Sequence, residues 1–292
     1  MPKSDHPKSA REVKRALTQA FEGAGIPYAE EDALELILAA TEFDKNALIL
    51  RGTEPLTPEA SDLIESYRDR RLSGEPVDHI LGWREFYGRR FQISKDVLSP
   101  RADTETLIRG ALKRLGQTGN PTLLDLGTGS GAIGLTLLAE TPEARLIATD
   151  LSEAALAMAQ ANADALCLSA RADFHQGAWW KAVPADHKFD MILSNPPYIT
   201  DAAMENLERE VTNFDPDMAL RGGFDGLDAY RHIISGTAKH LKPKGWLGLE
   251  IGFDQWPALK NLLEAGTWSN ITLDTDLGGL DRVVWAQISA EI

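Results

Sequence analysis

The sequence predicts an α/β protein in which a doubly wound sheet domain follows a small helical domain, with a β-hairpin joining them. About the first 75 residues show only the apolar spacing of helices. From about residue 106 onward, short apolar runs alternate with helical stretches, which is typical of a sheet with helices on both faces. We therefore expect a helical recognition domain at 1–80, a hairpin linker at 81–105 and a sheet domain at 106–292.

The N-terminal domain is predicted to consist of three or four short helices. Apolar residues recur at helical spacing over residues 9–23 and 30–43. A third helix is expected after Thr57, because threonine is a good N-cap and Pro58 suits the first helical position. Gly74-Glu75-Pro76 is expected to end the helical region. No pattern of catalytic residues occurs here, so we expect this domain to bind or position a partner.

A β-hairpin is predicted between Trp83 and Val97, where aromatic and β-branched residues flank Gly88, a candidate turn residue. A helix through Leu107, Ile108 and Ala111 should follow. The sheet domain then alternates between the two kinds of element. We expect strands at 122–126, 145–149, 172–175, 189–193, 245–251, 272–274 and 281–288, and helices at 132–140, 153–165 and 227–241.

The segment Ser194 to Tyr198 forms a stiff turn at the carboxyl end of the strand that contains Met191-Ile192-Leu193. Pro196 and Pro197 must end this strand, because neither can donate a ladder hydrogen bond. Open α/β sheets bind their ligands at the carboxyl ends of strands. The turn is therefore a candidate binding site, although an ordinary Asn-Pro-Pro loop would have the same sequence.

The groups that this turn presents suit a planar ligand that carries an NH2. The Asn195 side-chain oxygen and the Pro196 carbonyl are both acceptors, and Tyr198 adds an aromatic face. A carboxamide or the exocyclic amine of a nucleobase has the matching donors.

A glycine-rich turn, Gly127 to Gly131, follows the first strand of the sheet domain, and Asp150 closes the next strand. This is the outline of a nucleotide-binding fingerprint, in which glycines allow close backbone approach and the acid binds ribose hydroxyls. The pattern also fits the NAD version, and a glycine turn used only for close packing is a further alternative. Asp125 favours S-adenosylmethionine, because an acid directly before the turn can orient an ammonium group.

Composition excludes several classes of function. The net charge of −14 argues against a nucleic-acid substrate, since a protein that neutralises phosphates is usually basic. The single cysteine, Cys167, permits no internal disulfide, and we expect it to pack as a small apolar residue. The six histidines show no pairing typical of a metal site, so we expect no metal. No apolar run approaches the ~20 residues of a membrane span, and residues 1–14 lack a signal-peptide core, so we expect a cytoplasmic protein.

These motifs together resemble the release-factor glutamine methyltransferases, the PrmC/HemK family of class I S-adenosylmethionine-dependent methyltransferases, which have a Rossmann-like fold. The resemblance extends over nearly the whole chain. Ala102 and Asp215 depart from it, since the family usually has proline and glutamate there. The motifs that carry it are Gly74-Glu75-Pro76, Glu85 to Gly88, Ser99 to Glu105, Asp125 to Gly131, Asn195 to Tyr198, Ala219-Leu220, Gly222 to Leu227, Glu250-Ile251-Gly252 and Asp281 to Val284.

The resemblance also implies roles for individual residues. Asn195 and Pro196 would be catalytic, and Trp179 would stack beside the adenine, with Trp180 as the neighbouring candidate. Phe86 would help to close the pocket. The residues implied to bind substrate are Asn195, Pro196, Pro197, Tyr198 and Phe86. The residues implied to bind S-adenosylmethionine are Asp125, Gly127, Thr128, Gly129, Ser130, Gly131, Asp150, Trp179 and Asn195.

The resemblance implies methyl transfer to the side-chain amide nitrogen, N5, of the glutamine in the Gly-Gly-Gln loop of peptide chain-release factors. We expect a monomer whose partner is a release factor, without a nucleic-acid substrate or a membrane. Three alternatives stay open: a ribosomal-protein glutamine methyltransferase, a nucleic-acid adenine N6-methyltransferase, and a non-catalytic adaptor that keeps the cofactor fold.

Overall fold

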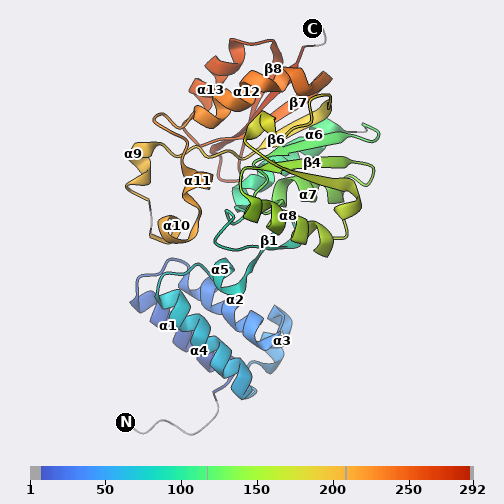
Figure 1. Cartoon of the computed structure of the whole chain (residues 1–292). Helices are drawn as coiled ribbons and strands as arrows, with labels where there is room; N and C mark the ends of the chain where they lie inside the picture. Colours follow the sequence, from blue (N-terminus) through green and yellow to red (C-terminus); the bar gives the residue numbers. More distant parts are fainter. Residues whose placement is uncertain (1–7, 117, 208, 290–292) are drawn as a thin grey trace. The chain divides into compact units, whose positions relative to one another are not determined.

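The computed structural model describes residues 8–116, 118–207 and 209–289, drawn in colour in Figure 1. Part of the polar segment at residues 1–14 therefore lies outside the described residues. The chain forms two compact units, Met1–Gly82 and Trp83–Ile292, and each is described by itself. None of the helices in the described ranges has both the length and the apolar character that a bilayer crossing requires.

The first unit is helical. Its core contains Phe21, Leu36, Ile37 and Ile64. A capping box at Ser9 begins the first helix, and Thr57 caps the fourth with proline at the next position, as predicted. The helices are α1 (Ala10–Gly23), α2 (Ala29–Thr41), α3 (Lys45–Arg51), α4 (Pro58–Leu72) and α5 (Val77–Leu81).

The predicted end of the helical region at Gly74-Glu75-Pro76 was wrong, because α5 follows directly. Pro76 has an extended backbone, with φ −61° and ψ 148°, and is the N-cap of α5. Proline fits the start of a helix, where its missing N–H costs nothing. Pro76 therefore begins α5, whereas α4 already ends at Leu72 with Ser73 as its C-cap.

The second unit begins with a hairpin of β1 (Trp83–Phe86) and β2 (Arg89–Gln92), paired antiparallel. The predicted turn residue Gly88 and its neighbour Tyr87 form the turn, and both have positive φ, which matches the right-handed twist of a two-residue hairpin. The second strand ends at Gln92 and does not reach Val97. Val97 packs instead against Ala155.

A seven-stranded sheet in the order β5-β4-β3-β6-β7-β9-β8 forms the centre of the second unit. The strands from β5 to β7 pair in parallel, whereas β9 runs antiparallel to both of its neighbours. The order reverses between β3 and β6, which makes this the switch point of the sheet. The strands are β3 (Thr122–Leu126), β4 (Arg145–Asp150), β5 (Ala172–Gln176), β6 (Phe189–Ser194), β7 (Leu241–Glu250), β8 (Trp268–Thr275) and β9 (Asp281–Ile288).

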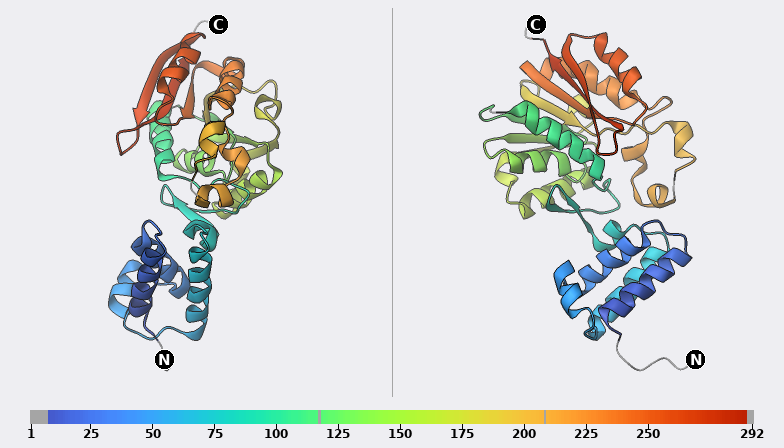
Figure 2. Two further views of the ribbon diagram at one scale, coloured as in Figure 1. Left: turned by 90° about the vertical axis from the view of Figure 1, so that its left-hand side faces the viewer. Right: turned by 180° about the vertical axis from the view of Figure 1, so that it is seen from behind.

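Helices cover both faces of this sheet, which confirms the predicted fold class. Alternate residues of each strand face opposite sides. Leu123 and Trp285 belong to a core with α6, α7 and α8, whereas Leu124 and Val284 belong to a core with α12 and α13 (Figures 1 and 2). The covering helices are α6 (Glu105–Leu115), α7 (Ala132–Glu140), α8 (Glu153–Ala165), α12 (Asp228–His240) and α13 (Trp256–Glu264).

Several short elements and boundaries differ from the sequence-based prediction. The strands β7 and β8 are longer than predicted, and Cys167 is exposed with φ 58° after the end of α8, instead of buried. The short helices are too brief to show a periodic pattern. The elements that the sequence did not predict are α3, α5, α9 (Asp201–Met204), α10 (Arg209–Phe214), α11 (Asp217–Leu220), α13 and the 3₁₀ turns η1 (Ala102–Thr104), η2 (Ser169–Arg171) and η3 (Trp179–Lys181).

Candidate active site

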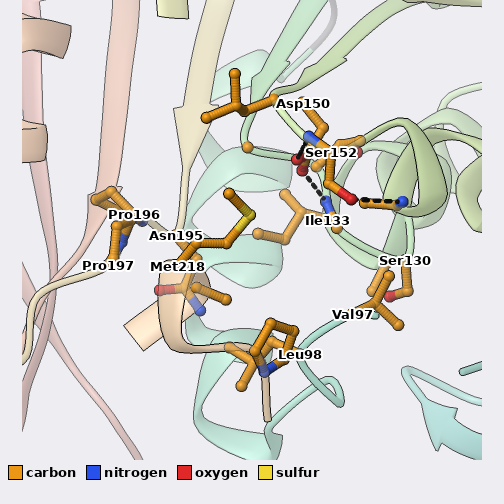
Figure 3. Close-up of a pocket in the computed structure, with 18 of the residues that line it drawn as sticks. Val97, Leu98, Ser130, Ile133, Asp150, Ser152, Asn195, Pro196, Pro197 and Met218 are labelled. Carbon is orange, nitrogen blue, oxygen red and sulfur yellow. Dashed lines mark hydrogen bonds between the residues drawn. The ribbon is translucent and has the colours of Figure 1, made fainter. Parts of the chain in front are cut away.

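A cavity opens at the carboxyl ends of β3, β4 and β6, where the sheet reverses its order. It encloses about 1140 Å³ of empty space, part of it open to solvent. Figure 3 shows Asp150 and Ser152 on one side and Asn195, Pro196 and Pro197 on another. The lining is mainly apolar, with a few polar groups from separate loops, which is typical of a ligand site.

The glycine-rich turn forms one wall of the cavity. Gly127, Gly129 and Gly131 all have positive φ, between 56° and 83°, a conformation that glycine adopts without strain. A Cβ on Gly131 would lie 2.7 Å from Leu135 Cδ1, so this glycine serves helix packing. A Cβ on Gly129 would meet nothing within 4 Å, so the backbone of Gly129 borders open space.

Asp150 lies at the end of β4 and fixes the shape of this turn. Its Oδ2 accepts a hydrogen bond from Gly129 N at 2.9 Å, and its Oδ1 accepts one from Ser152 N at 2.9 Å. The carboxylate also borders the cavity (Figure 3). Each carboxylate oxygen can accept a second hydrogen bond, so Asp150 can still bind a ligand hydroxyl.

Asp125 lies beneath the turn and does not line the cavity. Its Oδ2 accepts hydrogen bonds from Thr128 Oγ1 at 2.7 Å and Gly134 N at 3.0 Å. Burial raises the pKa of Asp125 to about 6, against the lowering effect of these two donors. Its Oδ1 is buried without a hydrogen-bond partner among the described residues. The structure therefore places Asp125 as a support of the turn.

The two adjacent tryptophans have separate surroundings. Trp179 lines the cavity, and its ring approaches Gly127 of the glycine-rich turn. Trp180 points elsewhere: its Nε1 donates to the His232 carbonyl at 2.8 Å, and its ring stacks on His240. Trp179 is therefore the tryptophan available to a ligand.

The turn after β6 is held from both sides. Ser194 Oγ donates to the Leu126 carbonyl at 2.6 Å, which ties the end of β6 to the end of β3. Asn195, Pro196 and Pro197 all line the cavity (Figure 3). Among the described residues, no N–H or O–H group is hydrogen-bonded to the Pro196 carbonyl. A ligand can therefore use this acceptor.

Gln255, which the sequence analysis missed, supports the same turn. Its Nε2 donates to the carbonyls of Tyr198 and Gly226, at 3.2 and 3.1 Å. Its Oε1 accepts from Gly252 N at 3.0 Å. A glutamine five residues beyond a strand end has no distinctive sequence pattern. Its position just after the Glu250-Ile251-Gly252 motif was the only available signal.

The two departures from the family pattern, Ala102 and Asp215, are each next in sequence to a residue of the cavity lining. Asp215 accepts a hydrogen bond from Arg101 Nη2 at 2.6 Å, and the Asp215 side chain is almost fully buried. Arg101 and Pro216 both line the cavity. This ion pair therefore joins two loops of the cavity wall. Ala102 begins the 3₁₀ turn η1, whose geometry does not require proline.

Two residues predicted to contact substrate lie outside the lining. Phe86 is 2% exposed and packs edge-to-face against Phe91 in the core, so its predicted role in closing the pocket was wrong. It belongs to a short strand whose inward face must be buried. Tyr198 is half-buried beside Gln255, and burial raises the pKa of its phenol.

The structure thus brings most of the predicted site residues to one cavity. Asp125, Gly131, Tyr198 and Phe86 are the exceptions. In the part of the chain that the structure describes, no group of histidine, cysteine and acidic side chains has the arrangement of a metal site. The predicted residues that line the cavity are Gly127, Thr128, Gly129, Ser130, Asp150, Trp179, Asn195, Pro196 and Pro197.

Two family models match separate parts of the chain. The model described as the PrmC N-terminal domain matches residues 12–82, and the model described as the methyltransferase small domain matches residues 103–213. Among solved structures, the hMettl16 catalytic domain in complex with a MAT2A 3′UTR hairpin is similar at a TM-score of 0.57. The likeness covers 87% of this chain and 91% of that chain at 16% identity, so it shows the fold alone.

Curated relatives match along almost their entire length. A protein of Cereibacter sphaeroides named release factor glutamine methyltransferase is 44% identical over 281 residues, covering 96% of this chain and 99% of the relative. A protein of the same name from Neisseria gonorrhoeae is 40% identical over 253 residues, covering 86% and 91%.

Proposed function

This chain belongs to the release factor glutamine methyltransferases, and we propose that it methylates the side-chain amide nitrogen, N5, of the glutamine in the Gly-Gly-Gln loop of peptide chain-release factors, with S-adenosylmethionine as donor. One observation carries the proposal: a single cavity contains both the glycine-rich turn with Asp150 and the acceptors of Asn195 and Pro196. The first set suits a nucleoside, and the second suits a planar group that carries an NH2.

The glycine-rich turn fits S-adenosylmethionine better than a dinucleotide. The N–H of Gly129 already donates to Asp150, so it is not free to bind a pyrophosphate. The Asp150 carboxylate beside the turn would also repel a diphosphate, whereas it can accept hydrogen bonds from ribose hydroxyls. Trp179 offers an aromatic surface for adenine. Asp150 and Trp179 would thus hold the nucleoside, and the bound cofactor supplies an electrophilic methyl on a sulfonium.

Asn195 and Pro196 would act on the acceptor amide. An amide nitrogen is a poor nucleophile, because its lone pair is delocalised into the carbonyl. Two N–H groups hydrogen-bonded to the Asn195 oxygen and the Pro196 carbonyl would fix the amide plane. They would also stabilise the positive charge that develops on nitrogen in the transition state. The rigid turn would aim the nitrogen at the methyl, at ~3–3.5 Å.

No general base is needed before transfer, since the amide is too weak an acid and its methylated form loses a proton readily. Two acids that follow the lining residue Arg101 along the chain are already engaged. Asp103 lies 3.3 Å from Arg282, and Glu105 accepts from Tyr87 N and pairs with Arg109. These contacts support a mechanism that depends on electrostatics and positioning.

A protein acceptor suits the charge of the chain better than a nucleic acid. The densest basic segment, at Arg68, Arg70 and Arg71, is neutralised by ion pairs with Asp69, Glu75 and Asp32. Paired arginines offer little attraction to phosphates. A Gly-Gly-Gln loop can enter a narrow cavity, because glycine has no side chain to obstruct the approach.

The decisive experiment measures transfer of labelled methyl from S-adenosylmethionine to three purified acceptors in parallel. These are a release factor, the same factor with the loop glutamine changed to alanine, and a ribosomal-protein fraction. We expect label on the unaltered release factor alone. Label only in the ribosomal fraction would refute the proposed acceptor and assign the alternative substrate.

A substitution tests the catalytic turn directly. Asn195→Ala should lower kcat by about 100-fold, the typical cost of removing one polar group that acts in the transition state. The Kd for S-adenosylmethionine should change less than threefold, because Asp150 and Trp179 remain. Equal losses of turnover and cofactor affinity would contradict the assigned role.

A further inference from the structure

Glu250 is a buried acid that no step described above uses. It ends β7 and is 2% exposed. Its Oε2 has no hydrogen-bond partner among the described residues, and no lysine, arginine or histidine among them forms an ion pair with it. Burying an unpaired carboxylate is costly, and an apolar residue of similar volume would stabilise the fold more. Stability therefore does not explain why a glutamate occupies this position.

The strand register places Glu250 beside Asn195. Ser194 of β6 pairs in parallel with Leu249 of β7, so the next residue of each strand end is Asn195 and Glu250. Leu193 lies two residues before Asn195, and its register partner Gly248 lies two residues before Glu250. Leu193 packs in the same core as Trp285, and a Cβ on Gly248 would collide with the Trp285 ring, so both residues face the side of the sheet that carries Trp285. Because side chains alternate, Asn195 and Glu250 project toward this same face. The Asn195 side chain is also among the groups that lower the pKa of Glu250, which fits this proximity.

Building on the proposed function, we infer that Glu250 is a positioning residue that holds the NH2 end of the Asn195 side chain and thereby turns its oxygen toward the acceptor amide. A carboxylate can only accept hydrogen bonds, so it must face the NH2 end. An asparagine amide otherwise has two orientations of similar shape, and only one presents the oxygen. Glu250 does not line the cavity, so it acts through Asn195.

The surroundings of Glu250 give this arrangement a dependence on pH. Burial raises the pKa of Glu250 to about 7, and the nearby Thr104 hydroxyl is the largest influence that lowers it. Tyr230 OH donates to the Glu250 backbone carbonyl at 2.9 Å and leaves the carboxylate untouched. The titratable and charged groups that influence or face Glu250 are Asp103 of η1, Arg282 of β9, Tyr198 after β6 and Tyr230 of α12.

Protonation of Glu250 removes the preference for one amide orientation. A neutral carboxyl group carries an O–H donor, which can bind the Asn195 oxygen and turn it away from the acceptor. As pH falls through about 7, the fraction of molecules with the productive orientation should therefore fall. The rate should decrease on the acid side without a matching loss of cofactor affinity.

The test compares wild type, Glu250→Gln and Glu250→Leu at saturating cofactor and release factor between pH 6 and 9. Glutamine keeps the shape of the side chain but can present either a donor or an acceptor to Asn195, so kcat should fall by about threefold to tenfold. The decrease of kcat at acid pH should disappear in this variant, because glutamine does not titrate. Leucine removes the acceptor and should lower kcat more than about tenfold, the value of a hydrogen bond to a charged group. The Kd for S-adenosylmethionine should stay close to wild type, and the Tm should not fall in either variant; in Glu250→Leu it should rise, because the buried carboxylate is gone.

Asn195→Ala is the matched background. There, neither Glu250 substitution should change the residual rate, because Glu250 acts only through Asn195. Full activity and an unchanged pH profile in Glu250→Gln, or an equal loss in both backgrounds, would overturn the inference while leaving the wild-type transfer reaction intact.

A spectroscopic readout needs no acceptor protein. The side-chain ¹⁵N amide resonances of Asn195 should titrate near pH 7 in wild type and stay constant in Glu250→Gln. Resonances that titrate equally in both proteins would refute contact with Glu250, whether or not the release factor is the substrate.

Discussion

The Asp150 carboxylate accepts a hydrogen bond from the backbone N–H of Gly129 at 2.9 Å, and this contact joins the end of β4 to the glycine-rich turn after β3. Asp150 also borders the cavity. One residue therefore both shapes the turn and presents a hydrogen-bond acceptor to the cavity. This double use explains why an acid at the end of the second strand of the sheet domain accompanies a glycine-rich turn at the end of the first.

Asp150→Ala should weaken S-adenosylmethionine binding by about 10- to 100-fold, since hydrogen bonds to a charged group contribute about 1.5–3 kcal/mol. Isothermal titration calorimetry measures the change in Kd. Asp173→Ala is the matched control, because Asp173 is an exposed residue of the neighbouring strand β5 and lies outside the cavity. Comparable affinity losses in both variants would argue against the role assigned to Asp150.

Trp179→Ala should weaken cofactor binding about tenfold or more, because stacking of a base on an aromatic ring contributes ~1–3 kcal/mol. Trp180→Ala should leave the Kd unchanged and lower the Tm, since that ring stacks on His240 and bonds to the His232 carbonyl. Calorimetry and thermal unfolding separate the two effects. The assignment fails when Trp180→Ala shows the larger loss of affinity.

Gly222→Ala should lower kcat while cofactor affinity is kept. A Cβ at this position would lie 2.8 Å from the backbone of Tyr198, closer than real contacts allow, so the turn after β6 must shift. A displacement of about 1 Å in a catalytic group can cost about 100-fold in rate. Gly119→Ala is the control, because a Cβ there meets nothing within 4 Å. Unchanged kcat in Gly222→Ala would show that the turn tolerates displacement.

Asp125→Asn should flatten the dependence of stability on pH. Burial raises the pKa of Asp125 from 3.8 to about 6 in the folded protein, so the folded state binds a proton more tightly than the unfolded chain. Its favourable effect is complete below about pH 3.8 and is lost as pH rises through about 6. The difference between these two pKa values corresponds to about 3 kcal/mol in the free energy of unfolding.

Urea unfolding of the protein without cofactor, between pH 4 and 7, measures this effect. The free energy of unfolding of wild type should fall relative to that of Asp125→Asn as pH rises. The difference between the two proteins removes the contribution of Glu250, which titrates in both. Parallel curves for the two proteins would contradict a raised pKa at Asp125.

Local patterns predicted the parts of the fold that a short segment decides for itself. The strand Thr122–Leu126, the helix Ala132–Glu140 and the cap at Thr57 were predicted at the positions where they occur. Their signals are apolar runs, glycine turns and N-cap chemistry, all of which act over a few residues. The four-residue helix α11 has no side-chain cap and left no such signal.

Site residues were predicted best where a motif names them. The turn from Asn195 to Pro197 and the glycine-rich turn both line the cavity as expected. Phe86 was misplaced, because the same aromatic residue suits a pocket or a core and only its packing against Phe91 decides. Gln255 was missed, because its role depends on reaching Tyr198 and Gly226 from a distant part of the chain.

The sequence by itself determined the order of elements, the two turns that border the cavity and the resemblance to a methyltransferase family, since each is encoded in contiguous residues. Only the tertiary structure decided which side chains reach the cavity and which support it from below. It selected Trp179 over Trp180, placed Asp125 beneath the turn and set Glu250 beside Asn195. The reason is that strand register and burial join residues far apart in the chain, and no local pattern records those contacts.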